Sequence, residues 1–223
     1  TVQDIRAIAE RVHAHGALLH TDAVQAAGKI PVDVRALDVD YLSLSSHKVY
    51  GPKGTGALYV RDKRPYCRFV HGGHQEDGRR AGTINAPAII GFGRAAELAL
   101  ADLENYQKTT RNLTDRLRQG IEKEIANIRI NSPFEQGLPN TLNVSFQGAE
   151  GEAILLYLDL AGIAVSTGSA CASGSLDPSH VLLATGLDAA YAHGSVRFSL
   201  GIENTEAEVD RVLQALPPII RKI

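Results

Sequence analysis

The sequence predicts an α/β fold, in which a mainly parallel sheet forms part of a large domain and a small α+β domain follows it. An amphipathic helix over residues 2–16 leads directly into a short apolar strand, Ala17–Leu19, which together make half of a βαβ repeat. Two further apolar segments, residues 38–44 and 57–61, flank a polar turn. The C-terminal half mixes short strands with helices, which is typical of an α+β domain.

The individual elements follow from periodicity and from capping residues. In the first helix, Ile5, Ile8, Ala9 and Val12 recur at helical spacing, and Gly16 stands where glycine commonly ends a helix. The domain boundary is expected near residue 102, with residues 1–102 in the large domain and 103–223 in the small one. The other expected elements are a turn or short helix at 32–36, a strand at 41–44, helices at 85–107 and 109–125, strands at 128–130 and 141–146, a helix at 151–160, a strand at 163–166, a short helix at 179–184, a strand at 195–200 and a last helix from Thr205.

Composition excludes several classes of function. A chain of 223 residues with 44% hydrophobic and 22% charged residues can bury a sizeable core, as ordinary globular proteins do. The formal net charge of −2 indicates no nucleic-acid surface, and no apolar run approaches the ~20 residues of a membrane span. Cys67 and Cys171 lie in different contexts that do not resemble a disulfide framework, which favours the cytoplasm. We expect no metal site and no signal peptide.

The turn SLSSHKVYGPKGTG, residues 43–56, carries the first chemically active candidate. Lys48 follows a predicted strand, in a loop that its glycines and proline bend sharply. A lysine amine forms a Schiff base readily when burial or nearby cations lower its pKa. Ser45, Ser46 and His47 supply donors that can hold an anion beside it. By itself, this segment also fits an ordinary solvated loop.

A second polar segment follows the predicted strand Ala17–Leu19 and includes His20, Asp22 and Gln25. Ligands of parallel α/β sheets lie beyond the carboxyl ends of the strands, where Asp22 and Lys48 are both expected. A lysine and a carboxylate in that arrangement suit pyridoxal phosphate. The amine binds the aldehyde, and the carboxylate keeps the ring nitrogen protonated.

The C-terminal half offers two further candidates. Cys171 lies in VSTGSACASGSL, among small residues that suit an exposed thiol as well as they suit a linker. Arg197 lies in an apolar strand, where a charge needs either a buried ion pair or a carboxylate ligand. Arg79, Arg80 and Thr83 fit a phosphate site, although the residues alone favour a solvated basic loop. We interpret Cys67 as structural.

Four motifs in order, HTDAVQ, SSHKVYGPKG, GGHQEDGRRAGT and VSTGSACASGSL, resemble the cysteine desulfurases of the NifS/IscS branch. These enzymes are fold-type I pyridoxal phosphate enzymes of the class V aminotransferase family, and the resemblance runs through essentially the whole chain. It implies conversion of L-cysteine to L-alanine, with the sulfur held as a persulfide on Cys171 and passed to an acceptor such as an iron–sulfur scaffold protein.

The resemblance also implies residue roles. Lys48 would carry the cofactor and move protons, and Arg197 would bind the substrate carboxylate. Thr83 would reach the partner's cofactor phosphate in a homodimer. The remaining cofactor contacts would be Asp22 at the pyridinium, Gln25 at the ring hydroxyl, and Ser45 and His47 at the phosphate.

The chain departs from the family at its start. A ring-stacking histidine, an asparagine and a phosphate-binding turn precede the matching region in the family, and the chain contains no methionine. We therefore expect it to be the C-terminal part of a longer enzyme that binds cofactor poorly alone. The alternatives are a selenocysteine lyase, another fold-type I enzyme such as an aminotransferase, or a truncated, non-catalytic binding module.

Overall fold

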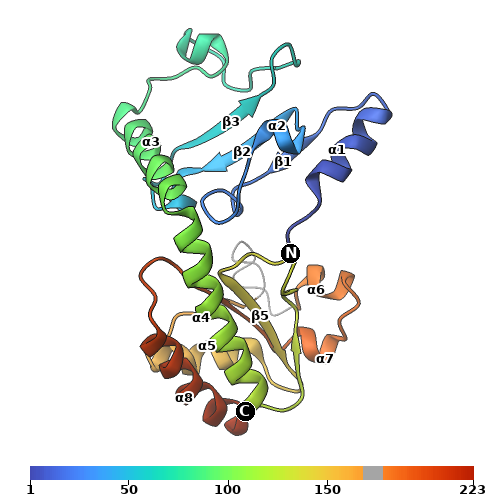
Figure 1. Cartoon of the computed structure of the whole chain (residues 1–223), viewed down its shortest axis with the longest axis vertical. Helices are drawn as coiled ribbons and strands as arrows, with labels where there is room; N and C mark the ends of the chain where they lie inside the picture. The colour runs from blue at the N-terminus through green and yellow to red at the C-terminus, as the bar shows by residue number, and fades with distance from the viewer. Residues whose placement is uncertain (168–177) are drawn as a thin grey trace. The chain divides into compact units, whose positions relative to one another are not determined.

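The computed structural model describes residues 1–167 and 178–223 (Figure 1). These residues form two compact units, residues 2–104 and residues 105–223, with Thr1 grouped with the second. Each unit contains a three-stranded sheet with helices packed around it. The prediction of an α/β fold is confirmed. None of the described helices is long and apolar enough to cross a membrane.

The first unit is built around the sheet β1-β2-β3. β1 and β2 are parallel, with His20 opposite Tyr41 and Asp22 opposite Ser43, whereas β2 and β3 are antiparallel. The parallel pair brings the carboxyl ends of β1 and β2 to one edge of the sheet. The elements of this unit are α1 (Ile5–Ala14), β1 (His20–Asp22), α2 (Val34–Leu37), β2 (Tyr41–Ser45), the 3-10 helix η1 (Ser46–Val49), β3 (Gly56–Val60), the 3-10 helix η2 (Gln75–Gly78) and α3 (Ala86–Ala101).

The start of β1 differs from the prediction, because the strand begins at His20 and not at Ala17. The N–H of Ala17 donates to the carbonyl of Val12 and remains tied to the end of α1. The N–H of Leu19 donates to the carboxylate of Asp40 at 2.9 Å, and not to a neighbouring strand. The hydrogen-bonded pairing of the sheet therefore starts at His20, the residue that follows Leu19.

The long helical region also divides earlier than predicted. α3 ends at Ala101, Asp102 caps it, and α4 runs from Leu103 to Glu124, whereas the sequence predicted a break near residue 108. Asn85 caps α3 as expected, since its side chain accepts the N–H of Ala88 at 3.3 Å.

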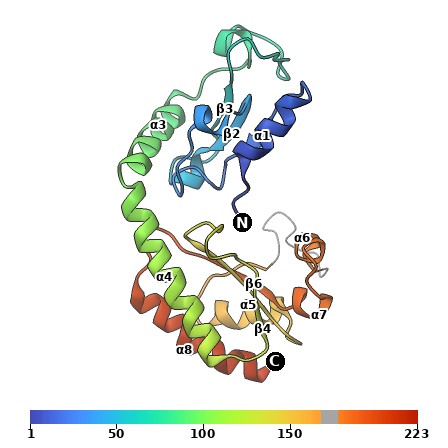
Figure 2. The same ribbon diagram turned by 45° about the vertical axis from the view of Figure 1, so that its right-hand side comes forward.

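The second unit contains an antiparallel sheet of order β4-β5-β6 (Figure 2). The predicted strand at 163–166 is absent from the described residues, where Ser166 alone forms a bridge to Arg197. The N–H of Ile163 instead donates to the carbonyl of Leu158 and closes the end of a helix. Besides α4, the elements are β4 (Ile128–Ile130), β5 (Thr141–Phe146), α5 (Gly151–Leu160), α6 (His180–Ala184), α7 (Ala189–Ala192), β6 (Ser195–Ser199) and α8 (Glu206–Lys222).

One apolar core holds this second unit together. Alternate residues of β5 and β6 face it, and α4, α5 and α8 cover it. α4 and α8 are also joined by Arg116, which donates two hydrogen bonds to the carboxylate of Asp210 at 2.8 and 2.9 Å. The core side chains include Leu113, Leu117, Ile121, Leu142, Val144, Phe146, Ile154, Leu158, Val196, Phe198, Val209 and Leu216. Because these residues alternate along the strands, the polar residues between them share the opposite face of the sheet.

Candidate active site

The polar residues of the first unit gather where β1 and β2 end. Asp22 is the last residue of β1 and lies beside Ser43 in register, and β2 continues to Ser45 before η1 begins. The N–H of Val24 donates to Oδ1 of Asp22 at 2.8 Å, which orients an exposed carboxylate. Lys48 lies within η1, so the amine and the carboxylate leave neighbouring strand ends at one edge of the sheet.

Ser45 and His47 form a second polar pair at this edge. A hydrogen bond of 2.9 Å joins Oγ of Ser45 to Nδ1 of His47. Ser45 is half-buried and His47 is exposed. A hydroxyl and an imidazole beside an ammonium make a donor set suited to a phosphate group.

The turn that carries Lys48 is closely packed. Ser46 and Val49 point inward and are buried, while Lys48 is partly exposed. The N–H of Gly51 donates to the carbonyl of Ser46 at 3.0 Å, and a Cβ at position 51 would collide with Oγ of Ser46. Tyr50 has a φ of 64°, so the chain reverses sharply after η1. This packing holds the lysine in one backbone geometry.

A stripe of small residues on α3 supports the same turn. A Cβ added to Gly91 would lie 2.7 Å from Cγ of Pro52, and one added to Gly51 would lie 3.1 Å from Cβ of Ala95. Ala99 comes similarly close to Gly28, at 3.3 Å from a Cβ built there. Positions 91, 95 and 99 share one helix face. α3 can therefore approach the lysine turn closely only because this face is small.

Lys29 is a neighbour of Lys48 that the sequence analysis missed. Lys29 is only 8% exposed, and its Nζ lies 3.4 Å from the carbonyl oxygen of Lys48. Burial lowers the pKa of Lys29 below its usual value, and the charge of Lys48 lowers it further. The signal was present in the apolar segment AAGKIPV, residues 26–32, but a lysine is so rarely buried that pattern reasoning leaves it on the surface.

Two residues predicted to contact the cofactor, Gln25 and Thr83, are not hydrogen-bonded to the lysine turn in the described residues. Gln25 is exposed in the turn that follows β1. Thr83 is exposed in the segment before α3, and no hydrogen bond between described residues joins it to the lysine turn. Cys67 is exposed as well, which does not support its interpretation as a structural residue.

Arg197 lies on β6 of the second unit, directly opposite Asn143 of β5. Its backbone exchanges hydrogen bonds with Ser166, at 2.7 and 3.1 Å. Its Nε is buried and has no hydrogen-bond partner among the described residues. A buried guanidinium nitrogen without a partner is costly unless a ligand completes it. Cys171 lies outside the described residues.

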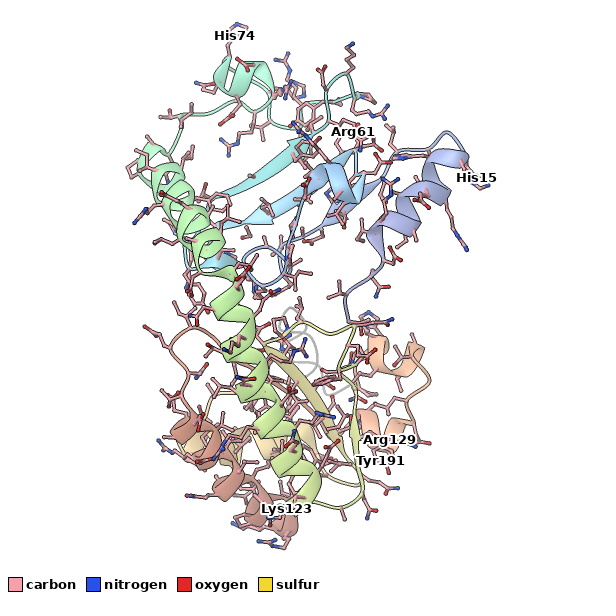
Figure 3. All side chains as sticks on the ribbon, in the orientation of Figure 1. His15, Arg61, His74, Lys123, Arg129 and Tyr191 are labelled. Atoms are coloured by element: carbon pink, nitrogen blue, oxygen red, sulfur yellow. The ribbon has the colours of Figure 1, made fainter. Side chains whose placement is uncertain are left out.

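A buried carboxylate, Asp40, lies at the opposite end of these strands, just before β2. It accepts hydrogen bonds from Leu19 N–H at 2.9 Å, His13 Nε2 at 2.8 Å and Arg64 Nε at 2.6 Å. Burial alone would raise the pKa of Asp40, but these hydrogen bonds outweigh it and lower the pKa to about 2. Arg61 lies beside this cluster (Figure 3) and donates to Asp38 at 2.7 Å. The cluster connects α1 with the entry to the sheet, far along the strands from Lys48.

Known proteins match this chain along its whole length. The family described as "Aminotransferase class-V" matches residues 1–212. A cysteine desulfurase of Gluconacetobacter diazotrophicus is 53% identical over 223 residues, and cysteine desulfurase IscS of Clostridium botulinum is 49% identical over 224 residues. The chain spans 56% of the length of each of these relatives.

Solved structures agree with this assignment. A NifS-like protein superposes with a TM-score of 0.90 at 38% identity, covering 100% of this chain and 58% of that one. A NifS-like protein from Rickettsia africae gives a TM-score of 0.90 at 32% identity, covering 98% of this chain and 58% of that one. The chain therefore belongs to the class-V aminotransferase family, and the relatives named above are cysteine desulfurases and NifS-like proteins.

Proposed function

We propose that the full-length protein is a pyridoxal phosphate-dependent cysteine desulfurase, which converts L-cysteine to L-alanine and collects the sulfur as a persulfide on Cys171. The observation that carries this proposal is the arrangement of Lys48 and Asp22 at neighbouring ends of β1 and β2. The similarity to named cysteine desulfurases selects this reaction among those that the cofactor supports.

The side chains of the first unit fit the cofactor chemically. An amine suits its aldehyde, a carboxylate suits its ring nitrogen, and a hydroxyl paired with an imidazole suits its phosphate. When bound, pyridoxal phosphate supplies an electron sink for bond cleavage at the substrate's Cα. In the second unit, the unpartnered buried Nε of Arg197 suits the α-carboxylate of an amino acid.

Each residue then has a defined task. Lys48 would hold the cofactor through its amine and, once that amine is free, would take a proton from the substrate's Cα and return one to Cα before L-alanine leaves. Asp22 would accept a hydrogen bond from the protonated ring nitrogen of the cofactor, and the N–H of Val24 orients its carboxylate. Further contacts are assigned to Gln25 at the ring hydroxyl, to Ser45 and His47 at the phosphate, and to Thr83 at the phosphate of the partner in a homodimer.

Sulfur transfer is assigned to Cys171. Its thiolate attacks the sulfur of L-cysteine, the S–S bond forms as the Cβ–S bond breaks, and Cβ takes up a proton. L-Alanine leaves, and the persulfide stays on the protein. We propose an iron–sulfur scaffold protein as the acceptor and the cytoplasm as the location.

The test compares two cysteine variants of the full-length protein. Cys171→Ser should keep the visible absorption of bound cofactor but lower alanine formation about 100-fold or more, because the sulfur acceptor is lost. Cys67→Ser, the matched control, should keep full activity. Undiminished sulfur transfer by the Cys171→Ser variant would contradict the assignment of Cys171 as the nucleophile.

A second comparison tests the cofactor and the substrate. Lys48→Ala should lose the visible band of the lysine-bound cofactor, and a retained band would contradict the role of Lys48. Parallel assays with L-selenocysteine separate a desulfurase from a selenocysteine lyase, because a lyase would act on the selenium substrate alone.

A further inference from the structure

The sheet of the second unit has a polar face opposite its apolar core. No residue of β4, β5 or β6 is acidic, whereas Arg129 and Arg197 both lie on the polar face. The guanidinium of Arg129 lies over the ring of Tyr191, at 5.8 Å from its centre. Arg197 has no such contact among the described residues, and its Nε is buried. This face therefore carries a positive charge that no acidic residue of its own strands balances, which suits an anionic ligand.

Asn143 is the neighbour of Arg197 on this face, since the two residues are directly opposite each other on β5 and β6. The backbone N–H and C=O of Arg197 both bond to Ser166, on the side away from β5. The N–H of Asn143 donates to Oγ of Ser132 at 2.8 Å, and its carbonyl accepts the N–H of Asn131 at 2.9 Å. Asn143 and Arg197 are therefore a cross-strand pair without backbone hydrogen bonds between them. In such pairs the side chains come closest, with Cβ atoms about 4.5 to 5.5 Å apart.

The amide group of Asn143 is held in one orientation. Its Oδ1 accepts a hydrogen bond from Nδ2 of Asn131 at 2.6 Å, and the same Nδ2 donates to Oγ of Ser145 at 2.8 Å. Asn131 follows β4, which lies on the opposite side of β5 from β6. The amide oxygen of Asn143 therefore points toward β4, which leaves its Nδ2 on the side of Arg197. Among the described residues, no acceptor is hydrogen-bonded to this Nδ2.

We propose that Asn143 is a further substrate-binding residue, whose Nδ2 donates a hydrogen bond to the α-carboxylate of L-cysteine beside the guanidinium of Arg197. This inference rests on the proposed function, which assigns that carboxylate to Arg197. A carboxylate has two oxygens, so it can satisfy both of these adjacent donors, neither of which has an acceptor among the described residues. Asn131 is a positioning residue, because it orients the amide of Asn143 before the substrate binds.

The test is Asn143→Asp in the full-length protein with its cofactor bound. An aspartate has nearly the same size and keeps an oxygen that accepts from Asn131, so the contacts that the structure shows for Asn143 are retained. It cannot donate a hydrogen bond, and it places a negative charge beside the substrate carboxylate. By calorimetry, the affinity for the product L-alanine should fall about 100-fold. The KM for L-cysteine should rise by a similar factor, while kcat changes less than about threefold.

A second ligand shows whether the effect acts through the carboxylate. L-Alaninamide has the same amine and methyl group as L-alanine but a neutral amide in place of the carboxylate. The wild-type protein should bind L-alanine more tightly than L-alaninamide, and Asn143→Asp should reduce that preference at least about 10-fold. The control is Asn112→Asp, the same change at an exposed residue of α4, which should leave both affinities unchanged.

Asn143→Ala removes the donor without adding a charge and replaces Asn143→Asp if that variant does not fold. It should weaken L-alanine binding about 10-fold, and its effect combined with Arg197→Lys should be smaller than the product of the two, because both residues contact one carboxylate. A folded Asn143→Asp or Asn143→Ala variant with wild-type affinity for L-alanine would overturn the proposal. So would a wild-type protein that binds L-alanine no more tightly than L-alaninamide, as expected if a carboxylate of the protein itself filled the site.

The binding of L-alanine does not depend on sulfur transfer. If the wild-type protein bound L-alanine but took no sulfur from L-cysteine, the proposed desulfurase function would fail, and the affinities of the Asn143 variants would still decide this inference. Conversely, an active desulfurase whose affinity for L-alanine is unchanged by Asn143→Asp would keep the function and lose the inference.

Discussion

The buried carboxylate Asp40 should control the acid stability of the first unit. Its pKa falls from 3.8 to about 2 in the folded protein, because hydrogen bonds to Leu19, His13 and Arg64 outweigh the effect of burial. At about 1.4 kcal/mol per pKa unit, the ionised group contributes roughly 2 kcal/mol to the free energy of unfolding. A lowered pKa means that this contribution is complete above the unfolded-state pKa. It is lost as the pH falls from about 4 to about 2.

The perturbation is Asp40→Asn, measured by urea unfolding at neutral pH and at a series of acidic pH values. At neutral pH the variant should lose about 2 to 4 kcal/mol, since it removes the charge and leaves Arg64 and His13 without their anion. Glu97→Gln is the matched control, because it breaks the exposed pair with Arg94 and should cost at most about 0.5 kcal/mol. The difference between wild type and Asp40→Asn should shrink toward pH 2. An Asp40→Asn cost equal to that of Glu97→Gln, or a difference that does not change with pH, would refute the reasoning.

Two further predictions concern the site. Gly51→Ala should destabilise the first unit by about 1 to 3 kcal/mol and reduce cofactor retention, because its Cβ would collide with Ser46. The control is Gly93→Ala, which should be neutral or slightly stabilising because no atom lies within 4 Å of a Cβ added there. Equal effects of the two substitutions would contradict this account. Arg197→Lys should raise the KM for L-cysteine about 10- to 100-fold with the cofactor band retained, since a lysine cannot form the bidentate contact. The control is Arg129→Lys, which should leave KM unchanged; the guanidinium of Arg129 lies 5.8 Å from the centre of the Tyr191 ring (Figure 3). An unchanged KM in the Arg197→Lys variant would contradict the assignment of Arg197 to the substrate carboxylate.

Elements with a strong local pattern were predicted well. The helix at 151–160 and the strand at 141–146 have the predicted bounds, because apolar periodicity and flanking glycine or polar residues are local properties. The strand predicted at 17–19 was wrong in its bounds, because the structure has it at His20–Asp22. The strand predicted at 163–166 is absent from the described residues. In both cases backbone groups are taken by partners outside a strand ladder, namely Asp40 for Leu19 and Leu158 for Ile163.

The candidate site shows the same division. Asp22, Lys48 and Arg197 could be recognised in the sequence, because a motif is defined by the types and the order of its residues. Their assigned roles stay predictions that the variants above test. Lys29 could not be recognised, because its burial and its contact with a turn 19 residues away depend on the tertiary structure.

The sequence alone determined the fold class, most helices and strands, and the family to which the chain belongs. These depend on periodicity, capping and motif order, which act over a few residues. Only the tertiary structure showed that Asp40 and Lys29 are buried charges, one with cationic partners and one in contact with the carbonyl oxygen of Lys48. Burial and pairing depend on which distant segments meet, and no local rule encodes that encounter.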